Sequence, residues 1–201
     1  MPLSPQLYDL ATGERKYLNR EERSSFLKAT QLQEQKTKFY CQLLYYTGCR
    51  LSEALEVSFD RFDYDKKGVM IRTLKQGSKD GKPIERYRFN ELPESYLNEM
   101  RGFFMAMKGK RKQEAAASER LWPVSTRMAN NYVATVMQAA EIAGKKASSR
   151  GLRHSMGVML ALEKVPVSVI RKVLGHAAIK NTLIYLDIIE DDRRDLVAQI
   201  W

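Results

Sequence analysis

Tyr185 and His176 are two residues near the carboxyl end whose types could do chemistry together. They lie nine residues apart in LGHAAIKNTLIYLD, the stretch that starts at residue 174. A phenol can act as a nucleophile, and an imidazole can donate or accept a proton. On one unbroken α-helix, nine steps of about 100° would place the two on opposite faces, roughly 13 Å apart along the axis. Either they are unrelated or the helix breaks between them.

Three other short stretches carry polar residues beside apolar ones: TGCRLSEAL from residue 47, LKQG from residue 74 and RGLRHS from residue 150. Taken singly, each has an ordinary explanation, because short motifs recur by chance. Arg50 with Glu53 reads as an ion pair. Lys75 reads as a solvated turn lysine, and His154 as a core histidine whose hydrogen bonds are satisfied. Their meaning depends on their combination.

Helix signals supply the break that the tyrosine and the histidine require. Gly175 favours the end of one helix, and Asn181 or Thr182 can cap the next. His176 is then expected just past a helix end, and Tyr185 in the first turn of another helix. With a turn between them, the two side chains can converge.

The rest of the chain predicts a mainly helical α+β fold with a small antiparallel hairpin. Asn19 and Glu22 form a capping-box pattern at a first helix. Apolar spacing and glycine stops predict further helices over about 33–47, from 51, over 127–143, 152–162 and 167–174, with a terminal one at about 188–201. Residues 68–74 and 84–89 read as two strands around the turn-rich QGSKDGKP.

Composition indicates one ordinary globular domain. The chain has 201 residues, of which 44% are apolar and 29% charged. No apolar run approaches the 18 or so residues of a membrane span, and the amino-terminal residues have no apolar signal segment. Cys41 and Cys49 form neither a disulfide framework nor a metal quartet. We therefore expect a protein of the reducing cytoplasm, without a membrane partner.

The positive charge is regional. The formal net charge is +10, and residues 101–150 hold ten Lys or Arg against three Glu, whereas residues 51–100 hold nine against ten acids. A regional excess is expected of a protein that neutralises phosphates, although a solvated basic face would look the same.

In their order and combination, the four stretches resemble the tyrosine recombinase (phage integrase) family. TGxRxSE, a lysine on a β-hairpin, LRH, LGH and a tyrosine nine residues past that histidine follow one another there as they do here. The resemblance runs from about Leu18 to Trp201, after an extension of residues 1–17. RLWPVS from residue 120 and VPVSVIRKVLGH from residue 165 resemble integrases of plasmids and mobile elements.

The resemblance implies that DNA strands are cleaved and rejoined without hydrolysis, metal, cofactor or small-molecule substrate. Tyr185 would attack phosphorus and keep the bond energy as a 3′-phosphotyrosine. Arg50 and Arg153 would hold the charge that develops on the nonbridging oxygens. Lys75 would protonate the leaving 5′ oxygen, and His176 would donate to the phosphate.

Some positions leave alternatives open. Lys79 and Lys82 are rivals of Lys75 as the general acid, because all three lie at the predicted hairpin. Glu53 carries over as a buried partner that orients the arginines. Cys49 is expected to pack, because a reactive thiol would need an electropositive, partly exposed setting and a base.

Arg150 departs from the family pattern, which usually has His or Lys three residues before the second arginine. A guanidinium still donates to phosphate, so Arg150 stays in the predicted site, but its high pKa makes proton exchange unfavourable. If the usual residue accepts the tyrosine's proton, that role is lost or moved here. His154 is expected to be structural, as is common in the family, and to lie outside the site.

The resemblance also implies partners and a domain plan. Family members usually place a helical core-binding domain of about 100 residues before the catalytic one, and no such domain is expected here, so the chain is either a piece of a longer protein or a minimal recombinase. Double-stranded DNA is the expected partner, bound by a homotetramer on paired sites. The tail DIIEDDRRDLVAQIW either packs on its own domain or docks in a neighbour.

Two other functions stay open from the sequence. A type IB topoisomerase uses similar chemistry to relax DNA without joining two sites, and a non-catalytic relative would bind DNA as a regulator. The tyrosine, the lysine and the two arginines favour the enzyme. The expected setting is the cytoplasm, associated with the nucleoid, of a prokaryote that carries the gene itself or on a phage or plasmid.

Overall fold

The computed structural model describes residues 4–74, 78–79, 82–83, 85–108 and 118–186. Its helices are α1 (Arg20–Thr30), α2 (Gln35–Thr47), α3 (Leu51–Leu55), α4 (Glu94–Lys108), α6 (Thr126–Ala139), α7 (Ser149–Leu162), α8 (Val167–Leu174) and α9 (Lys180–Leu183), with one 3-10 turn, Phe59–Arg61. Its strands are β1 (Phe62–Asp63), β2 (Gly68–Thr73), β3 (Ser78–Lys79), β4 (Lys82–Pro83) and β5 (Arg86–Glu91). The predicted fold class, mainly helical α+β with a small antiparallel sheet, is confirmed.

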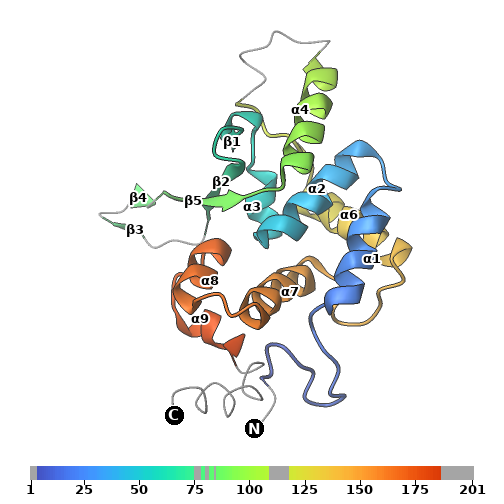
Figure 1. The fold of residues 1–201 in the computed structure, drawn as a ribbon, viewed down its shortest axis with the longest axis vertical. Coiled ribbons are helices and arrows are strands. Elements are labelled where there is room, and N and C mark those ends of the chain that lie inside the picture. The colour runs from blue at the N-terminus through green and yellow to red at the C-terminus, as the bar shows by residue number, and fades with distance from the viewer. Residues whose placement is uncertain (1–3, 75–77, 80–81, 84, 109–117, 187–201) are drawn as a thin grey trace.

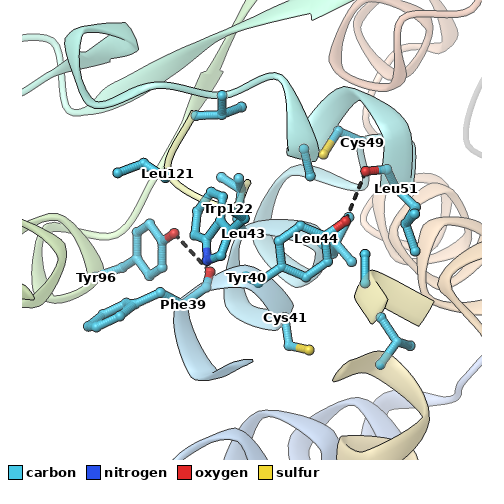
Figure 2. Close-up of a cluster of buried hydrophobic side chains, with 14 of the residues drawn as sticks. Phe39, Tyr40, Cys41, Leu43, Leu44, Cys49, Leu51, Tyr96, Leu121 and Trp122 are labelled. Atoms are coloured by element: carbon cyan, nitrogen blue, oxygen red, sulfur yellow. Dashed lines mark hydrogen bonds between the residues drawn. The ribbon is translucent and has the colours of Figure 1, made fainter. Parts of the chain in front are cut away.

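Helix α2 lies at the centre of the helical part and contacts α1, α3, α4, α6 and α7. Apolar side chains on several of its faces are therefore buried in one large core. Figure 2 shows Tyr40, Leu43 and Leu44 of α2 beside Trp122, whose indole N–H donates to the carbonyl of Lys36. The aromatic groups are thus held by hydrogen bonds as well as by packing.

A second, smaller apolar cluster lies between α7 and α8. It includes Leu7 of the amino-terminal segment, Val158, Ile170, Leu174 and Tyr185, all nearly inaccessible to solvent. Figure 1 shows α7, α8 and α9 gathered at one end of the molecule, where α8 lies against β5 and α7 against α2. Tyr185, the predicted nucleophile, is therefore part of the apolar cluster at this end of the molecule.

The sheet is antiparallel in the order β1-β2-β5, with Thr73 paired to Arg86 at its open end. β3 and β4 form a separate two-stranded ladder, which projects beside the sheet in Figure 1. The first predicted strand ends one residue early, and the second runs two residues later than predicted, because the register pairs Gly68 with Glu91. β1 and α4 were not predicted.

Two helices end at the predicted glycines, and these glycines let distant segments approach closely. Gly48 ends α2 and Gly175 ends α8, both in the left-handed conformation. A Cβ on Gly48 would lie 2.8 Å from Leu174 Cδ2 and 2.9 Å from Met156 Cβ. The end of α2 can thus approach α7 and α8 only without a side chain at this position.

Helix α7 begins three residues before the predicted start. The Ser148 side chain caps it by accepting the amide N–H of Gly151, so Arg150 lies within the first turn. The predicted terminal helix, about 188–201, lies outside the described residues. In the part that is described, no helix is long and apolar enough to cross a membrane.

Candidate active site

A hollow of about 540 Å³ opens where α3, α7 and the α8–α9 turn meet. The described residues that line it include three arginines and two histidines and no carboxylate: Gln6, Arg50, Leu51, Ser149, Arg150, Arg153, His154, His176, Asn181, Ile184 and Tyr185. Five of the six predicted catalytic residues therefore meet in one place. Such a set of hydrogen-bond donors favours the binding of an anion.

Arg50 is held at the entrance to α3 by Glu53. Its Nη1 donates to Glu53 Oε1 at 2.7 Å, and its backbone N–H donates to Oε2 at 3.1 Å. Glu53 is fully buried. Burial alone would raise the pKa of Glu53, but the charges and hydrogen bonds of Arg88 and Arg50 outweigh it and hold that pKa below its ordinary value. The predicted role of Glu53 as a buried partner of the arginines fits this geometry.

Arg88 of β5 is a residue of this network that sequence reasoning missed. Its Nη2 donates to Glu53 Oε2 at 2.6 Å and its Nη1 to Thr73 Oγ1 at 2.8 Å. Its Nε donates to the carbonyl of Val173. Arg88 therefore ties the sheet, α3 and α8 together, and no local pattern around it in the sequence marks this role.

Arg153 of α7 lines the hollow and bonds to the ends of α2 and α8. Its Nη1 donates to the carbonyl of Gly48 at 2.8 Å and its Nη2 to the carbonyl of Leu174 at 2.7 Å. Burial, with the nearby charge of Arg50, lowers the pKa of Arg153 to about 10, so it remains charged at neutral pH. Arg50 and Arg153 thus come from separate elements to one site, as predicted.

His176 follows the end of α8 and contacts Thr182 through Nδ1, at 2.9 Å from Oγ1. Burial, then Arg153 and Arg50, lower its pKa to about 3, so the imidazole is neutral. If the Thr182 hydroxyl donates to Nδ1, Nε2 carries the proton and can donate to a ligand. The expected role of His176 as a donor requires that tautomer.

The helix break between His176 and Tyr185 is confirmed. Their rings stack, with centroids 6.2 Å apart and planes 13° apart. The detail of the prediction is wrong, however: α9 begins at Lys180, ahead of Asn181 and Thr182, and Tyr185 lies just past its end. Thr182 does not cap the helix, because its hydroxyl contacts His176 instead.

Tyr185 is almost wholly buried, at 1% exposure. Its ring lies against Gly157, where any Cβ would overlap it. Burial raises the pKa of Tyr185 to about 12, while Arg153, Arg150 and Arg50 pull that pKa down. The phenol is therefore protonated at neutral pH, because the effect of burial outweighs the charges of the three arginines.

His154 lies in the site and contacts the tyrosine, so the expectation that it stays outside was wrong. Its Nδ1 is 3.1 Å from Tyr185 Oη, and its Nε2 accepts the Nε–H of Arg150 at 3.2 Å. The two residues stand one turn apart on α7, which brings their side chains together. The signal in the sequence was this spacing of four residues.

A second hollow, of about 410 Å³, adjoins the first through His176. It lies between β5 and the α8–α9 turn, and its lining includes Arg86, Arg171 and Lys172. Arg171 donates to the carbonyls of His176 and Ala177 and so holds the turn that carries the histidine.

The remaining predicted residues fall into two groups. Lys75 lies outside the described residues, and the side chains of Lys79 and Lys82 do too, although their backbones pair across β3 and β4. Cys49 is buried, and that burial raises its pKa to about 11, which fits packing. Within the described ranges, no three His, Cys, Asp or Glu side chains gather as a metal site would require.

Comparison with known proteins decides the family. The sequence model described as "Phage integrase family" matches residues 16–191. The chain belongs to the phage integrase family. The resemblance drawn from the four motifs is thereby confirmed.

Individual relatives are distant. The tyrosine recombinase XerA of Thermococcus kodakarensis is 26% identical over 174 residues, which are 85% of this chain and 57% of that protein. The chain spans about half the length of the curated relatives it matches. Two solved structures share the fold. A XerH recombinase in a post-cleavage complex with palindromic difH substrate has a TM-score of 0.72 at 20% identity, covering 92% of this chain and 53% of that one. The Tn1549 transposon integrase with transposon right-end DNA has a TM-score of 0.70 at 18% identity, covering 92% and 68%.

Proposed function

We propose that the chain is the catalytic part of a site-specific DNA recombinase or integrase that cleaves and rejoins strands through a 3′-phosphotyrosine. The observation that supports this best is the hollow itself, where Tyr185 faces three arginines and two histidines without a carboxylate among the described lining residues. Fixed donors of this kind stabilise an anionic transition state more than a neutral ground state. Membership of the phage integrase family points the same way.

In the proposed step, Tyr185 Oη attacks the phosphorus of a DNA phosphodiester. The new bond joins Oη to phosphorus, the bond from phosphorus to the 5′ oxygen breaks, and the phenol proton leaves. Arg50, Arg153 and His176 hold the nonbridging oxygens, where negative charge gathers. The reverse reaction, by a 5′ hydroxyl of another strand, restores the tyrosine and completes strand transfer.

The leaving 5′ oxygen takes a proton from a lysine, for which we propose Lys75, with Lys79 and Lys82 as alternatives. A substrate with sulfur in place of the 5′ bridging oxygen separates them, because a thiolate leaves without a general acid. The variant whose slow cleavage this substrate restores, among Lys75→Ala, Lys79→Ala and Lys82→Ala, identifies the acid. Equal restoration of all three would contradict the assignment.

Double-stranded DNA is the proposed partner, and four protomers the proposed assembly, working with the DNA in the cytoplasm of a prokaryote. Exchange between two duplexes breaks four strands, and each protomer brings one Tyr185. Relatives support the choice of DNA, since the XerH and Tn1549 integrase structures are complexes with DNA.

A suicide substrate tests the shared chemical step. A nicked duplex loses its short leaving strand after cleavage, so the covalent protein–DNA adduct accumulates and is seen on a denaturing gel. We expect adduct with the wild type and none with Tyr185→Phe, which lacks the nucleophilic oxygen. Tyr8→Phe is the matched control, because Tyr8 bonds to Tyr17 outside the hollow.

Two outcomes would overturn the proposal. Adduct from Tyr185→Phe would remove the tyrosine from the mechanism, and no adduct from the wild type would favour a non-catalytic DNA-binding relative. Joining of two paired sites then separates recombination from relaxation of a single supercoiled plasmid.

A further inference from the structure

We propose that Arg150 acts through His154: it fixes the tautomer in which His154 donates its Nδ1–H to Tyr185 Oη and so stabilises the developing phenolate. This rests on the proposed function, in which Tyr185 is the nucleophile. It gives Arg150 a role other than that of the His or Lys expected at its position.

The tautomer follows from the donors on either side of the ring. A guanidinium only donates, so Arg150 Nε, at 3.2 Å, makes His154 Nε2 the acceptor. A neutral imidazole has one N–H, which must then be on Nδ1. Nδ1 lies 3.1 Å from Tyr185 Oη, so it donates to the tyrosine oxygen.

The neutral state of His154 is set by its surroundings. The residue is 8% exposed. Burial, then the charges of Arg150 and Arg153, lower its pKa to about 4. At neutral pH the ring therefore has a free lone pair on Nε2, which the contact with Arg150 requires.

The direction of this hydrogen bond decides what His154 can do. A nitrogen that donates to Oη cannot accept the phenol proton from it, so His154 is not the general base. The phenol hydrogen must point away from the imidazole, and the proton passes to water in the hollow. As negative charge grows on Oη, the Nδ1–H···O bond strengthens, because bonds to ionised acceptors are about twice as strong.

The ¹⁵N chemical shifts of the histidine rings test the relay, by which we mean the hydrogen bonds from Arg150 to His154 and from His154 to Tyr185, and the measurement needs no DNA. The chain has only two histidines, so ¹⁵N-labelled protein gives two imidazole spin systems, and the one lost in His154→Asn is assigned to His154. We expect His154 to carry its proton on Nδ1 at pH 7, and Arg150→Met to shift population to the Nε2–H form. A wild-type His154 protonated on Nε2 would overturn the proposal.

Cleavage rates on the suicide substrate test the consequence. His154→Phe keeps the ring but cannot donate, so we expect adduct formation to slow by about 10- to 100-fold, the worth of a hydrogen bond to a charged group. His154→Asn places an amide N–H near the position of Nδ1, so its rate should stay within about fivefold of the wild type. Equal rates in all three proteins, or equal slowing in both variants, would overturn the relay.

The ¹⁵N shifts and the adduct formation rates distinguish failure of this proposal from failure of the proposed function. If the wild type forms no adduct but His154 is the Nδ1–H tautomer, recombinase activity fails and the hydrogen bond to Tyr185 stands. If adduct forms but His154 carries Nε2–H, the activity stands and the relay fails. Thermal unfolding of each variant shows whether a slow rate reflects loss of fold.

Discussion

His154 is neutral and buried beside two arginines, and this makes the stability of the fold depend on pH. Its pKa is about 4 in the fold, against about 6.5 in an unfolded chain. Between these values the unfolded state binds more protons, so the free energy of unfolding rises with pH. The stabilisation is complete above about pH 6.5 and is lost as the pH falls toward 4.

Comparison with a variant isolates this contribution. We expect the wild type to lose about 1 kcal/mol per pH unit more than His154→Asn between pH 6 and 4.5. The variant has no imidazole at this position, whereas the carboxylates titrate in both proteins and cancel in the difference. Urea unfolding at several pH values measures it, and parallel lines for the two proteins would contradict the burial argument.

Gly157 leaves the space that the Tyr185 ring fills, since a Cβ there would overlap the ring. We expect Gly157→Ala to displace Oη and slow adduct formation by roughly 100-fold, because small misplacements of a reacting group are costly. Gly102→Ala in α4 is the matched control: its Cβ would meet nothing within 4 Å. That control should keep the wild-type rate and gain up to about 1 kcal/mol of stability. Unchanged cleavage by Gly157→Ala would show that the ring can move freely.

Single residues could be predicted where a local signal accompanied them. Arg50, Arg153, His176 and Tyr185 stand in motifs beside helix ends, so their convergence in one hollow could be anticipated. Arg88 could not be found, because its partners are 15 and 35 residues away and only the fold brings them together.

At the level of elements, Arg88 makes the sheet part of the site. Its side chain is 8% exposed and bonds to Glu53, which is fully buried. We expect Arg88→Met to cost about 3 kcal/mol, because the buried carboxylate of Glu53 then loses one of its two guanidinium partners and keeps only Arg50. Arg72→Met is the matched control on β2, since the Arg72–Glu85 pair is exposed and worth less than about 1 kcal/mol.

Urea unfolding compares these two arginine variants, and equal losses would contradict the argument. The double variant Arg88→Met with Glu53→Gln should recover part of the stability, because the buried carboxylate that has lost one of its two guanidinium partners is gone. Adduct formation should fall in Arg88→Met as well, since Glu53 orients Arg50.

Elements with strong local signals were predicted, and those set by tertiary pairing were not. The capping box at Asn19 and the glycine stops at Gly48 and Gly175 marked their helices well, whereas α6 ends at Ala139, before Gly144. Helix α4 was missed although its buried positions follow helical spacing: Tyr96, Leu97, Met100, Phe103 and Phe104. β1 has only two residues, and its pairing with β2 defines it, so no periodic pattern could reveal it.

Across the whole molecule, the regional charge predicted from the sequence is partly neutralised in the fold. In residues 101–150, Lys145 and Lys146 pair with Asp9 and Glu22, and Arg120 pairs with Glu56. The two adjoining hollows have no carboxylate among their described lining residues. We therefore expect the surface that joins the first hollow to the second, here called the path, to contact DNA phosphates.

Lys172 tests this path, because it is exposed at the second hollow and away from the proposed chemistry. We expect DNA affinity to fall steeply with salt, and Lys172→Gln to reduce the slope of log affinity against log salt by about one, the effect of one phosphate contact. Lys66→Gln is the control, since Lys66 lies between β1 and β2 beside Asp63. Fluorescence anisotropy over a range of salt concentrations measures both slopes. An unchanged slope for Lys172→Gln, or affinity independent of salt in the wild type, would place the DNA elsewhere, because counterions are released only where phosphates are neutralised.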